Sequence, residues 1–237
     1  MLLAVTQNNP KKELEYLTTL REKQVDGVIL VATVFTTEHR QVLKELVVPV
    51  VIVGQRLSGY CCVYHDDYHA SYELTKLLLE KGRKRLGYIG AILQDKAVGA
   101  ERYRGFQEAV CKYGLEELAK NYVIASFTVA SGYKKAEELM QKCKELDGIV
   151  CATDAMAAGA MQYLREKRIA VPKQIWVVGQ GDSEMAQVTT PPFVTVHYSY
   201  EKSGEIGIQM LLEVLEQGET DLKEIKLGYS IVEQERK

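Results

Sequence analysis

The side chains with the greatest capacity for chemistry follow directly after short apolar runs. Residues 175–178 break off into the polar stretch 180–183, and residues 149–152 are followed by Thr153 and Asp154. Amides and hydroxyls donate and accept hydrogen bonds and carboxylates accept them, so these groups suit the binding of a polar ligand. The sequence contains no GxSxG elbow, no Walker loop and no GxGxxG after its first apolar run, which are motifs of common enzyme classes. We therefore expect a binding protein and not an enzyme.

The order of the expected secondary structure decides where these residues meet. Apolar, β-branched runs alternate with segments of helical period, which is typical of parallel sheets covered by helices. We expect strands at residues 2–5, 28–32, 50–53, 86–89, 123–125, 149–152 and 175–178. Ligands of doubly wound sheets lie beyond the carboxyl ends of the strands. The candidate site is therefore formed by the following loops, at residues 7–9, 33–36, 54–56, 127–131, 153–154, 180–183 and 197–200.

Length, charge and cysteine content narrow the class of protein. A chain of 237 residues with 46% hydrophobic residues can bury one large core or two smaller lobes. The net charge is -2, and the one compact basic run, residues 81–85, is better explained as a helix end capped by Gly82 than as a DNA contact. Five cysteines without a CxxC pair suit a reducing cytoplasm. No run approaches the roughly 20 apolar residues of a membrane span, so no membrane partner is expected.

The last part of the chain departs from simple alternation. Pro191 and Pro192 cannot continue a helix, residues 193–200 have an extended pattern, and residues 203–215 resume a helical period. A late strand that crosses from one lobe to another would explain this order.

Six segments resemble the LacI/GalR transcriptional regulators in order and spacing. They are "VDGVIL", "VPVVIVGQR", "LLLEKGRKRLGYIG", "RYRGFQEAV", "DGIVCATDAMAAGAMQYLREKRIAVPKQIWVVGQGDSE" and "TTPPFVTVHYSYEKSG". The resemblance covers nearly the whole chain and implies an α/β, two-lobed periplasmic-binding-protein-like type I fold with parallel, doubly wound sheets. It also implies a sugar effector, no cofactor, a homodimer and the repression of an operon. The "GDSE" and "VHYSY" forms look most like repressors of sucrose operons in low-GC Gram-positive bacteria.

The same resemblance divides the chain into domains. It implies an N-terminal lobe of residues 1–63 and 197–224 and a C-terminal lobe of residues 64–196 and 225–237, with crossings near residues 63–66, 195–198 and 224–227. The family begins with a helix-turn-helix domain, a hinge and a first strand and helix of the core, which this sequence does not contain. We therefore expect an incomplete N-terminal lobe, and operator DNA bound only through the missing domain.

Arg102 falls where the family places an arginine that binds effector hydroxyls. A planar guanidinium fork suits two neighbouring acceptors on a sugar. The same fork also serves structural ion pairs, so Arg102 can instead pair with a carboxylate such as Glu101 or Asp95.

Three aromatic residues match family positions that face the effector. Phe127 aligns with a ring that stacks on effectors, although a plain core phenylalanine is equally compatible with the sequence. Tyr198 and Tyr200 match cleft positions, and alternation along a strand would place both on one side, with His197 and Ser199 on the other. A half-buried sheet produces the same alternation, so the pattern leaves both interpretations open.

Two departures from the family pattern change the expected hydrogen-bond partners. Many members carry Asn-Asp where this chain has Thr153 and Asp154, and Asp-Asp where it has a Gly-Asp pair that ends in Asp182. We expect Gln55, Gln180 and Asp182 to offer the missing donors and acceptors to a small carbohydrate. The alternative for Asp182 is a cap on the short helix that follows it.

A pair of histidines superficially resembles a metal site. His65 and His69 lie four residues apart with Asp66 and Asp67 between them. We expect no metal here, because Asp67 is better explained as the start of a helix and no distant ligand is indicated.

Two other functions stay compatible with these observations. A periplasmic or lipid-anchored sugar-binding protein of a transporter would share the two lobes, but the free cysteines and the segments "ATDAMAAGAMQYL" and "VPKQIWVVG" argue against it. A doubly wound enzyme acting on a sugar phosphate would show turnover. We favour the cytoplasmic effector-sensing domain of a repressor.

Overall fold

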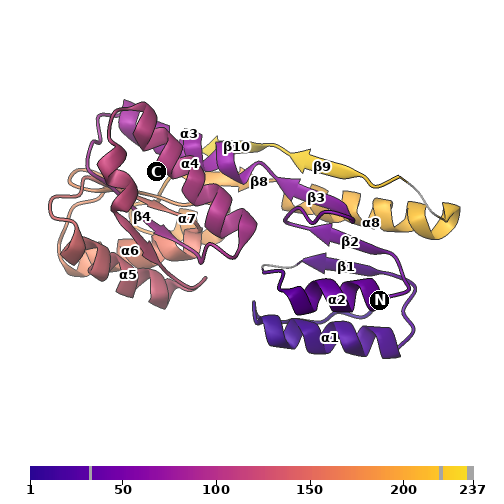
Figure 1. Ribbon diagram of the computed structural model, residues 1–237. Helices are drawn as coiled ribbons and strands as arrows, with labels where there is room; N and C mark the ends of the chain where they lie inside the picture. Colours follow the sequence, from indigo (N-terminus) through magenta and orange to yellow (C-terminus); the bar gives the residue numbers. More distant parts are fainter. Residues whose placement is uncertain (32–33, 219–220, 234–237) are drawn as a thin grey trace. The chain divides into compact units, whose positions relative to one another are not determined.

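The polypeptide folds into two α/β units, each with its own parallel sheet (Figure 1). The structure, a computed structural model, describes residues 1–31, 34–218 and 221–233. Unit 1 consists of Met1–His65, Gln94–Lys96 and Ser199–Gly228, and unit 2 of Asp66–Leu93, Ala97–Tyr198 and Tyr229–Lys237. The expected α/β class with parallel sheets is confirmed. The assignment of the units to the predicted lobes, whose boundaries differ from these by a few residues, stays a prediction.

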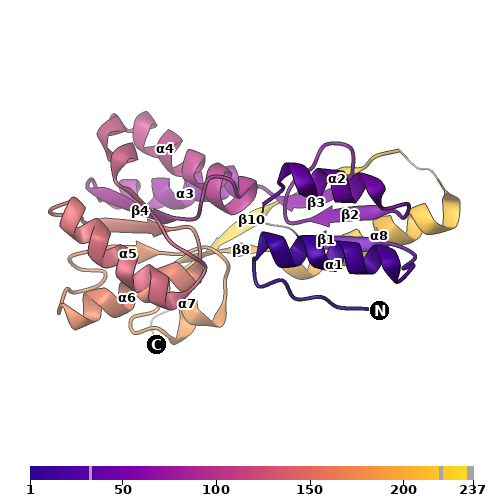
Figure 2. The same cartoon turned by 60° about the horizontal axis from the view of Figure 1, so that its bottom comes forward.

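Unit 1 is built on a four-stranded parallel sheet in the order β1-β2-β3-β9. Helices α1 and α2 cover one face of this sheet, where Leu17 and Leu43 pack against Ile52. Helix α8 covers the other face, where Met210 packs against Val51 (Figure 2). The elements are α1 (Pro10–Glu22), β1 (Val28–Val31), α2 (Thr37–Glu45), β2 (Val50–Val53), β3 (Cys61–His65), α8 (Tyr200–Gln217) and β9 (Glu224–Leu227).

The strand predicted at residues 2–5 is wrong. These residues run outside the sheet, and their apolar side chains are exposed. An apolar run forms a strand only where a sheet edge accepts its hydrogen bonds and a second layer covers its side chains. The described part of unit 1 offers no such cover, since Ile29 and Val31 on the α8 side of β1 are themselves exposed. The strand predicted at residues 28–32 is confirmed for Val28–Val31, whereas Ala32 and Thr33 lie outside the described residues.

Unit 2 is built on a four-stranded parallel sheet in the order β5-β4-β6-β7. Tyr88 of β4 packs against Phe106 of α4, whereas its neighbour Gly87 faces Leu139 of α5, so helices cover both faces. The elements are α3 (Asp67–Glu80), β4 (Leu86–Gly90), η1 (Lys96–Glu101), α4 (Arg102–Lys112), η2 (Glu116–Lys120), β5 (Tyr122–Ile124), α5 (Val129–Lys142), β6 (Gly148–Cys151), α6 (Asp154–Glu166), β7 (Trp176–Val178), α7 (Glu184–Val188), β8 (Thr195–Tyr198) and β10 (Tyr229–Val232). From β4 the chain goes to β5 on one side and then to β6 on the other, which makes the gap between β4 and β6 the switch point.

The late extended segment is shorter than predicted. Strand β8 pairs antiparallel with β10 and ends at Tyr198, and α8 begins at Tyr200. The prediction that Tyr198 and Tyr200 share one side of a strand is therefore wrong, because the chain leaves the strand conformation at Ser199. Tyr198 is fully buried in unit 2, whereas Tyr200 opens a helix of unit 1 and is 51% exposed.

The basic run at residues 81–85 ends a helix, as predicted. Helix α3 stops at Glu80, and Gly82 adopts a φ of 82°, which favours glycine. Arg83 donates to the carbonyl oxygen of Pro172 at 2.7 Å, and Arg85 lies 3.7 Å from Asp147. Both arginine side chains thus contact groups of unit 2.

Helices α5 and α6 cross at two glycines. A Cβ on Gly159 would lie 2.2 Å from the carbonyl oxygen of Val129, and one on Gly132 would lie 2.5 Å from that of Met156. Both clashes are with backbone atoms, which cannot rotate away as a flexible side chain can. The two helices therefore approach closely only while both positions are glycine.

The substitution Gly159→Ala is expected to lower the free energy of unfolding by roughly 1–3 kcal/mol, because overpacking forces the helices apart. Urea denaturation measures the change. Gly204→Ala is the matched control, since nothing lies within 4 Å of a Cβ at this position of α8. It should be neutral or stabilising by up to about 1 kcal/mol through helix propensity. Equal effects of the two substitutions would contradict the close approach.

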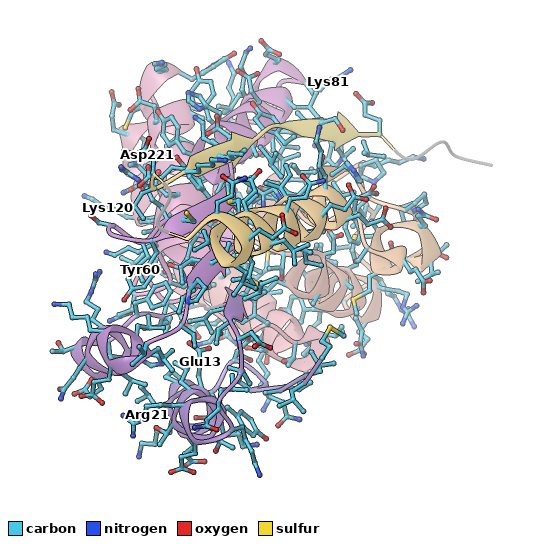
Figure 3. The ribbon with its side chains drawn as sticks, turned by 90° about the vertical axis from the view of Figure 1, so that its right-hand side faces the viewer. Glu13, Arg21, Tyr60, Lys81, Lys120 and Asp221 are labelled. Atoms are coloured by element: carbon cyan, nitrogen blue, oxygen red, sulfur yellow. The ribbon has the colours of Figure 1, made fainter. Side chains whose placement is uncertain are left out.

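A carboxylic acid and an imidazole are buried together between α1 and α2. Glu13 and His39 are 4% and 0% exposed, and Nε2 of His39 lies 3.4 Å from Oε1 of Glu13 without a hydrogen bond between them. Figure 3 labels Glu13 on α1. Burial raises the pKa of Glu13 to about 7 and lowers the pKa of His39. Both groups are therefore favoured in their neutral forms.

The raised pKa of Glu13 makes stability depend on pH. The stability that protonated Glu13 contributes is fully present below the ordinary pKa of 4.5 and is lost as the pH rises through about 7. This loss lowers the free energy of unfolding by on the order of 3 kcal/mol. The lowered pKa of His39 acts in the opposite direction, because protonation below its ordinary value of 6.5 favours the unfolded chain. Urea denaturation between about pH 5 and pH 8 should show a smaller loss of stability for Glu13→Gln than for the unchanged protein. Identical pH profiles of the variant and the unchanged protein would contradict a raised pKa of Glu13.

Candidate functional site

Arg102 lies at the switch point of the unit 2 sheet. Its Nε donates to Oδ1 of Asp67 at 2.7 Å, and its Nη1 donates at 2.6 Å to the carbonyl oxygen of Ala152, directly after β6. The side chains of Arg102 and Asp67 are each 5% exposed. The structural alternative for Arg102 is thus realised with Asp67, whereas Glu101 pairs with Arg104. This ion pair joins the start of α3, the start of α4 and the end of β6.

Tyr198 and Gln180 extend this arrangement towards β7. The guanidinium carbon of Arg102 lies 4.5 Å from the centre of the Tyr198 ring, a cation–π distance. The Tyr198 hydroxyl donates to Oε1 of Gln180 at 2.9 Å, and Nε2 of Gln180 donates to the carbonyl oxygen of Cys151 at 3.2 Å. Gln180 and Tyr198 are both buried, so their polar groups serve each other.

Asp154 organises a second network beside the first. Its Oδ1 accepts from the Thr195 hydroxyl at 2.6 Å, and its Oδ2 accepts from the backbone N–H of Ser183 at 2.7 Å and the Ser183 hydroxyl at 3.0 Å. Burial raises the pKa of Asp154, and the hydrogen bonds from Thr195 and Ser183 lower it in part. Thr153 caps α6 by accepting from the N–H of Met156. Asp154 thereby ties the loop after β7 to the start of α6.

Asp182 joins the second network through its backbone, whereas its carboxylate lies beside His197. Its Oδ2 lies 2.9 Å from Nδ1 of His197, and its N–H donates to the Thr195 hydroxyl at 3.1 Å. The N-cap of α7 is Ser183, so Asp182 does not cap this helix. Gly181 and Asp182 have φ values of 138° and 48°. The first of these angles favours glycine, which is the residue at position 181.

The other residues predicted to bind a ligand are divided between the two units. Phe127 follows β5, is half-buried and packs against the unit 2 core. In unit 1, Gln55 follows β2 and is buried. The ring of Tyr200 packs edge to face against that of His65, with 5.2 Å between their centres. His69, the other histidine of the sequence pair, lies 2.8 Å from Oδ1 of Asp66.

The sequence indicated most of these polar residues, and the ligand-binding role expected of them stays a prediction. Arg102, Asp154, Gln180 and Tyr198 are buried in contact with one another or with backbone, so they fix the loops. Phe127, Thr153 and Asp182 keep exposed surface that a ligand can contact, and so does His197. Three partners were missed, namely Asp67, Thr195 and His197. The signal for Asp67 was the pair of aspartates directly after β3, which we interpreted only as a helix start.

Comparison with known proteins shows which family and which solved structures this chain is similar to. Residues 75–235 match a family model described as a periplasmic binding protein-like domain. The HTH-type transcriptional regulator RegA of Clostridium saccharobutylicum is 32% identical over 95% of this chain and 68% of its own length. The sucrose operon repressor of Staphylococcus xylosus is 27% identical over 91% of this chain and 66% of its own length. A solved complex of the transcriptional regulator CelR with cellobiose has a TM-score of 0.85 at 27% identity and covers 94% of this chain and 69% of that chain.

These similarities define a periplasmic-binding-protein-like domain, the class that the resemblance of the six sequence segments implied. The chain belongs to the LacI/GalR family of transcriptional regulators. It spans about two thirds of the length of the curated relatives named above, 68% and 66%. Among the residues that the structure describes, no helix combines the length and the apolar character needed to cross a membrane.

Asp67→Ala is expected to lower the free energy of unfolding by roughly 3–5 kcal/mol, because the substitution leaves the buried guanidinium of Arg102 without this carboxylate. Glu101→Ala is the matched control, since it removes a carboxylate from the exposed pair with Arg104. That loss should stay within about 1 kcal/mol. Urea denaturation compares the two. A loss for Asp67→Ala as small as that of the control would show that the buried pair does not hold the strand ends together.

Proposed function

We propose that this chain is the effector-sensing domain of a LacI-type repressor, with a small sugar as its effector. The observation that carries the proposal is the arrangement at the carboxyl ends of the unit 2 strands. A rigid, internally satisfied polar base there supports the outward residues Phe127, Thr153 and Asp182. Such a base suits a site that must present few groups in fixed positions.

The proposed contacts follow from the chemistry of a sugar. Hydroxyls in the ring plane need donors and acceptors, which Asp182 and Thr153 offer, and the apolar C–H face suits the rings of Phe127 and Tyr200. We propose that Arg102 and Gln180 hold the loops in place and complete the hydroxyl contacts. Asp154 and Tyr198 are proposed to position their neighbours, and Gln55 to contribute from unit 1.

A disaccharide related to sucrose is the proposed effector. One relative, 27% identical, is named as a sucrose operon repressor, and a structure of equal identity holds cellobiose. Both names describe those proteins. They support a two-ring sugar here because the identities extend over 91% and 94% of this chain.

The proposed mechanism is a ligand-dependent closure of the two units. A sugar can shift the equilibrium between open and closed forms only by its differential affinity for them. In a homodimer, closure would alter the spacing of two helix-turn-helix heads, outside this sequence, on a palindromic operator. The domain would thus act in the cytoplasm, without catalysis, and convert sugar binding into a change of DNA affinity.

The surface of α7 supports the proposed homodimer. Val188 is 75% exposed and Met185 is also exposed. Val188 lines a groove of about 230 Å³ together with Met161 and Arg165 of α6. Arg165 and Glu184 form no ion pair within the part of the chain that the structure describes. Across a two-fold axis, the patch would offer an apolar centre with opposite charges at its margin.

Isothermal titration calorimetry with sucrose, fructose, glucose and their phosphates should give saturable binding of one sugar to this chain. Asp182→Ala should weaken that binding at least about tenfold, because a charged hydrogen-bond partner is lost. Glu216→Ala, an exposed substitution on α8, is the control and should bind as the unchanged protein does. An absence of binding across the panel would reject the sugar effector, whereas unchanged affinity of Asp182→Ala would reject only the role of that residue.

A further inference from the structure

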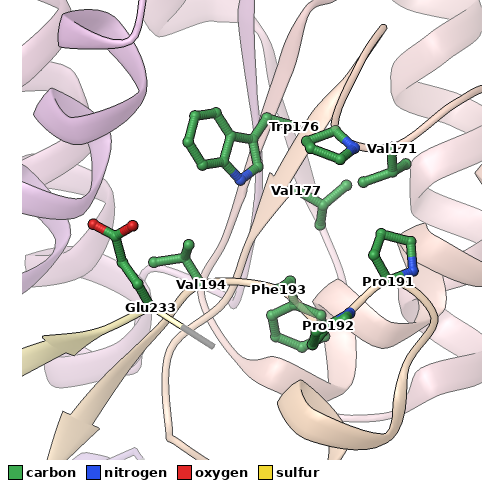
Figure 4. A pocket seen from close by; sticks show the side chains of 9 residues that line it. Val171, Trp176, Val177, Pro191, Pro192, Phe193, Val194 and Glu233 are labelled. Atoms are coloured by element: carbon green, nitrogen blue, oxygen red, sulfur yellow. The ribbon is translucent and has the colours of Figure 1, made fainter. Parts of the chain in front are cut away.

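Unit 2 contains a second pocket that shares no residue with the candidate sugar site. Its volume is about 240 Å³, and three prolines, three valines, Trp176, Phe193 and Glu233 line it (Figure 4). The walls come from the turn before β7, from β7 itself, from the segment between α7 and β8, and from the end of β10. The pocket is thus formed entirely within one unit.

The size and lining of this pocket restrict its ligand. Drug-sized ligands occupy roughly 300–1,000 Å³, so about 240 Å³ suits a smaller molecule. Eight of the nine lining residues are proline, valine, tryptophan or phenylalanine, so the side chains of the lining offer a ligand one hydrogen-bond donor, the indole N–H, and one acceptor group, the Glu233 carboxylate. Glu233 is the single ionisable lining residue, so an anion such as phosphate would be repelled. These properties favour a small organic cation, whose N–H groups can donate to the carboxylate and whose carbon atoms can pack against the apolar side chains.

Trp176 and Glu233 supply two attractions for such a cation. Figure 4 shows the indole ring and the carboxylate on one side of the pocket, with Pro191 on the other. A cation is attracted to the face of an indole ring and to a carboxylate. Glu233 forms no ion pair within the described part of the chain. The nearby cation Arg83 donates to the carbonyl oxygen of Pro172 but does not line the pocket.

We propose that this pocket binds a small organic ammonium ion, with its charged group held by Glu233 and Trp176 and its apolar body packed against Pro191 and Phe193. Phe193 is 2% exposed and belongs to the unit 2 core, so this wall is fixed before the ligand arrives. The ammonium group keeps contact with solvent through the exposed carboxylate, which avoids the cost of burying a charge completely.

The chain provides its own reporter for this site. Trp176 is the only tryptophan among 237 residues, so tryptophan fluorescence arises from the pocket alone. We would titrate the chain with benzylammonium, with its neutral isostere benzyl alcohol and with the anion benzoate at neutral pH. Benzylammonium should change the fluorescence saturably and bind about tenfold more tightly than benzyl alcohol, and benzoate should not bind. Equal affinity for the charged and neutral probes, or no saturable change with benzylammonium, would overturn the proposal.

The substitution Glu233→Gln tests the assignment of the charge. In this variant the preference for benzylammonium over benzyl alcohol should fall from about tenfold to about threefold or less, because the neutral amide removes the ion pair and leaves only the cation–π contact with Trp176. Glu216→Gln on α8 of unit 1 is the matched control and should leave the preference unchanged. Thermal unfolding and the emission wavelength of Trp176 without ligand establish that the variants fold alike. An undiminished, about tenfold preference for benzylammonium in Glu233→Gln would overturn the role of the carboxylate. The sugar titrations use other residues, so either proposal can fail without the other.

Discussion

The buried ion pair between Arg102 and Asp67 is the interaction on which the polar end of unit 2 depends. A guanidinium that is 5% exposed must be paired and hydrogen-bonded, because an isolated buried charge is strongly unfavourable. Arg102 satisfies this requirement with Asp67, the carbonyl oxygen of Ala152 and the ring of Tyr198. One charge therefore fixes two helix starts, a strand end and the last residue of β8, where the chain leaves unit 2.

The same requirement explains why so few polar groups are left for a ligand. Gln180 and Asp154 are buried, and their partners are backbone groups, Tyr198, Thr195 and Ser183. Groups satisfied in this way are held by several partners at once, which favours fixed positions for the neighbouring residues. A rigid base with few exposed contacts is consistent with a family whose members share one fold and bind different effectors.

Most of the fold could be predicted from the sequence. Parallel strands buried on both faces give continuous apolar runs such as residues 50–53 and 149–152, and these were recognised as strands. The prediction failed at residues 2–5, whose pattern is equally apolar, because strand formation also needs a free sheet edge and a covering layer. It failed again at Tyr200, because the extended pattern expected for residues 193–200 includes a residue that begins helix α8.

The sequence by itself determined the fold class, the family and the strand ends at which polar residues gather, because hydrophobic periodicity and motif order are local properties of the chain. Only the tertiary structure decided which of those residues face inwards. Asp67 and Arg102 are distant in sequence, and their pairing results from the side-by-side packing of α3 and α4. The pocket of Trp176 and Glu233 likewise joins β7 with the end of β10, two segments that only the folded unit brings together. Burial decides which polar side chains must find partners within the protein, and burial is a property of the packed chain.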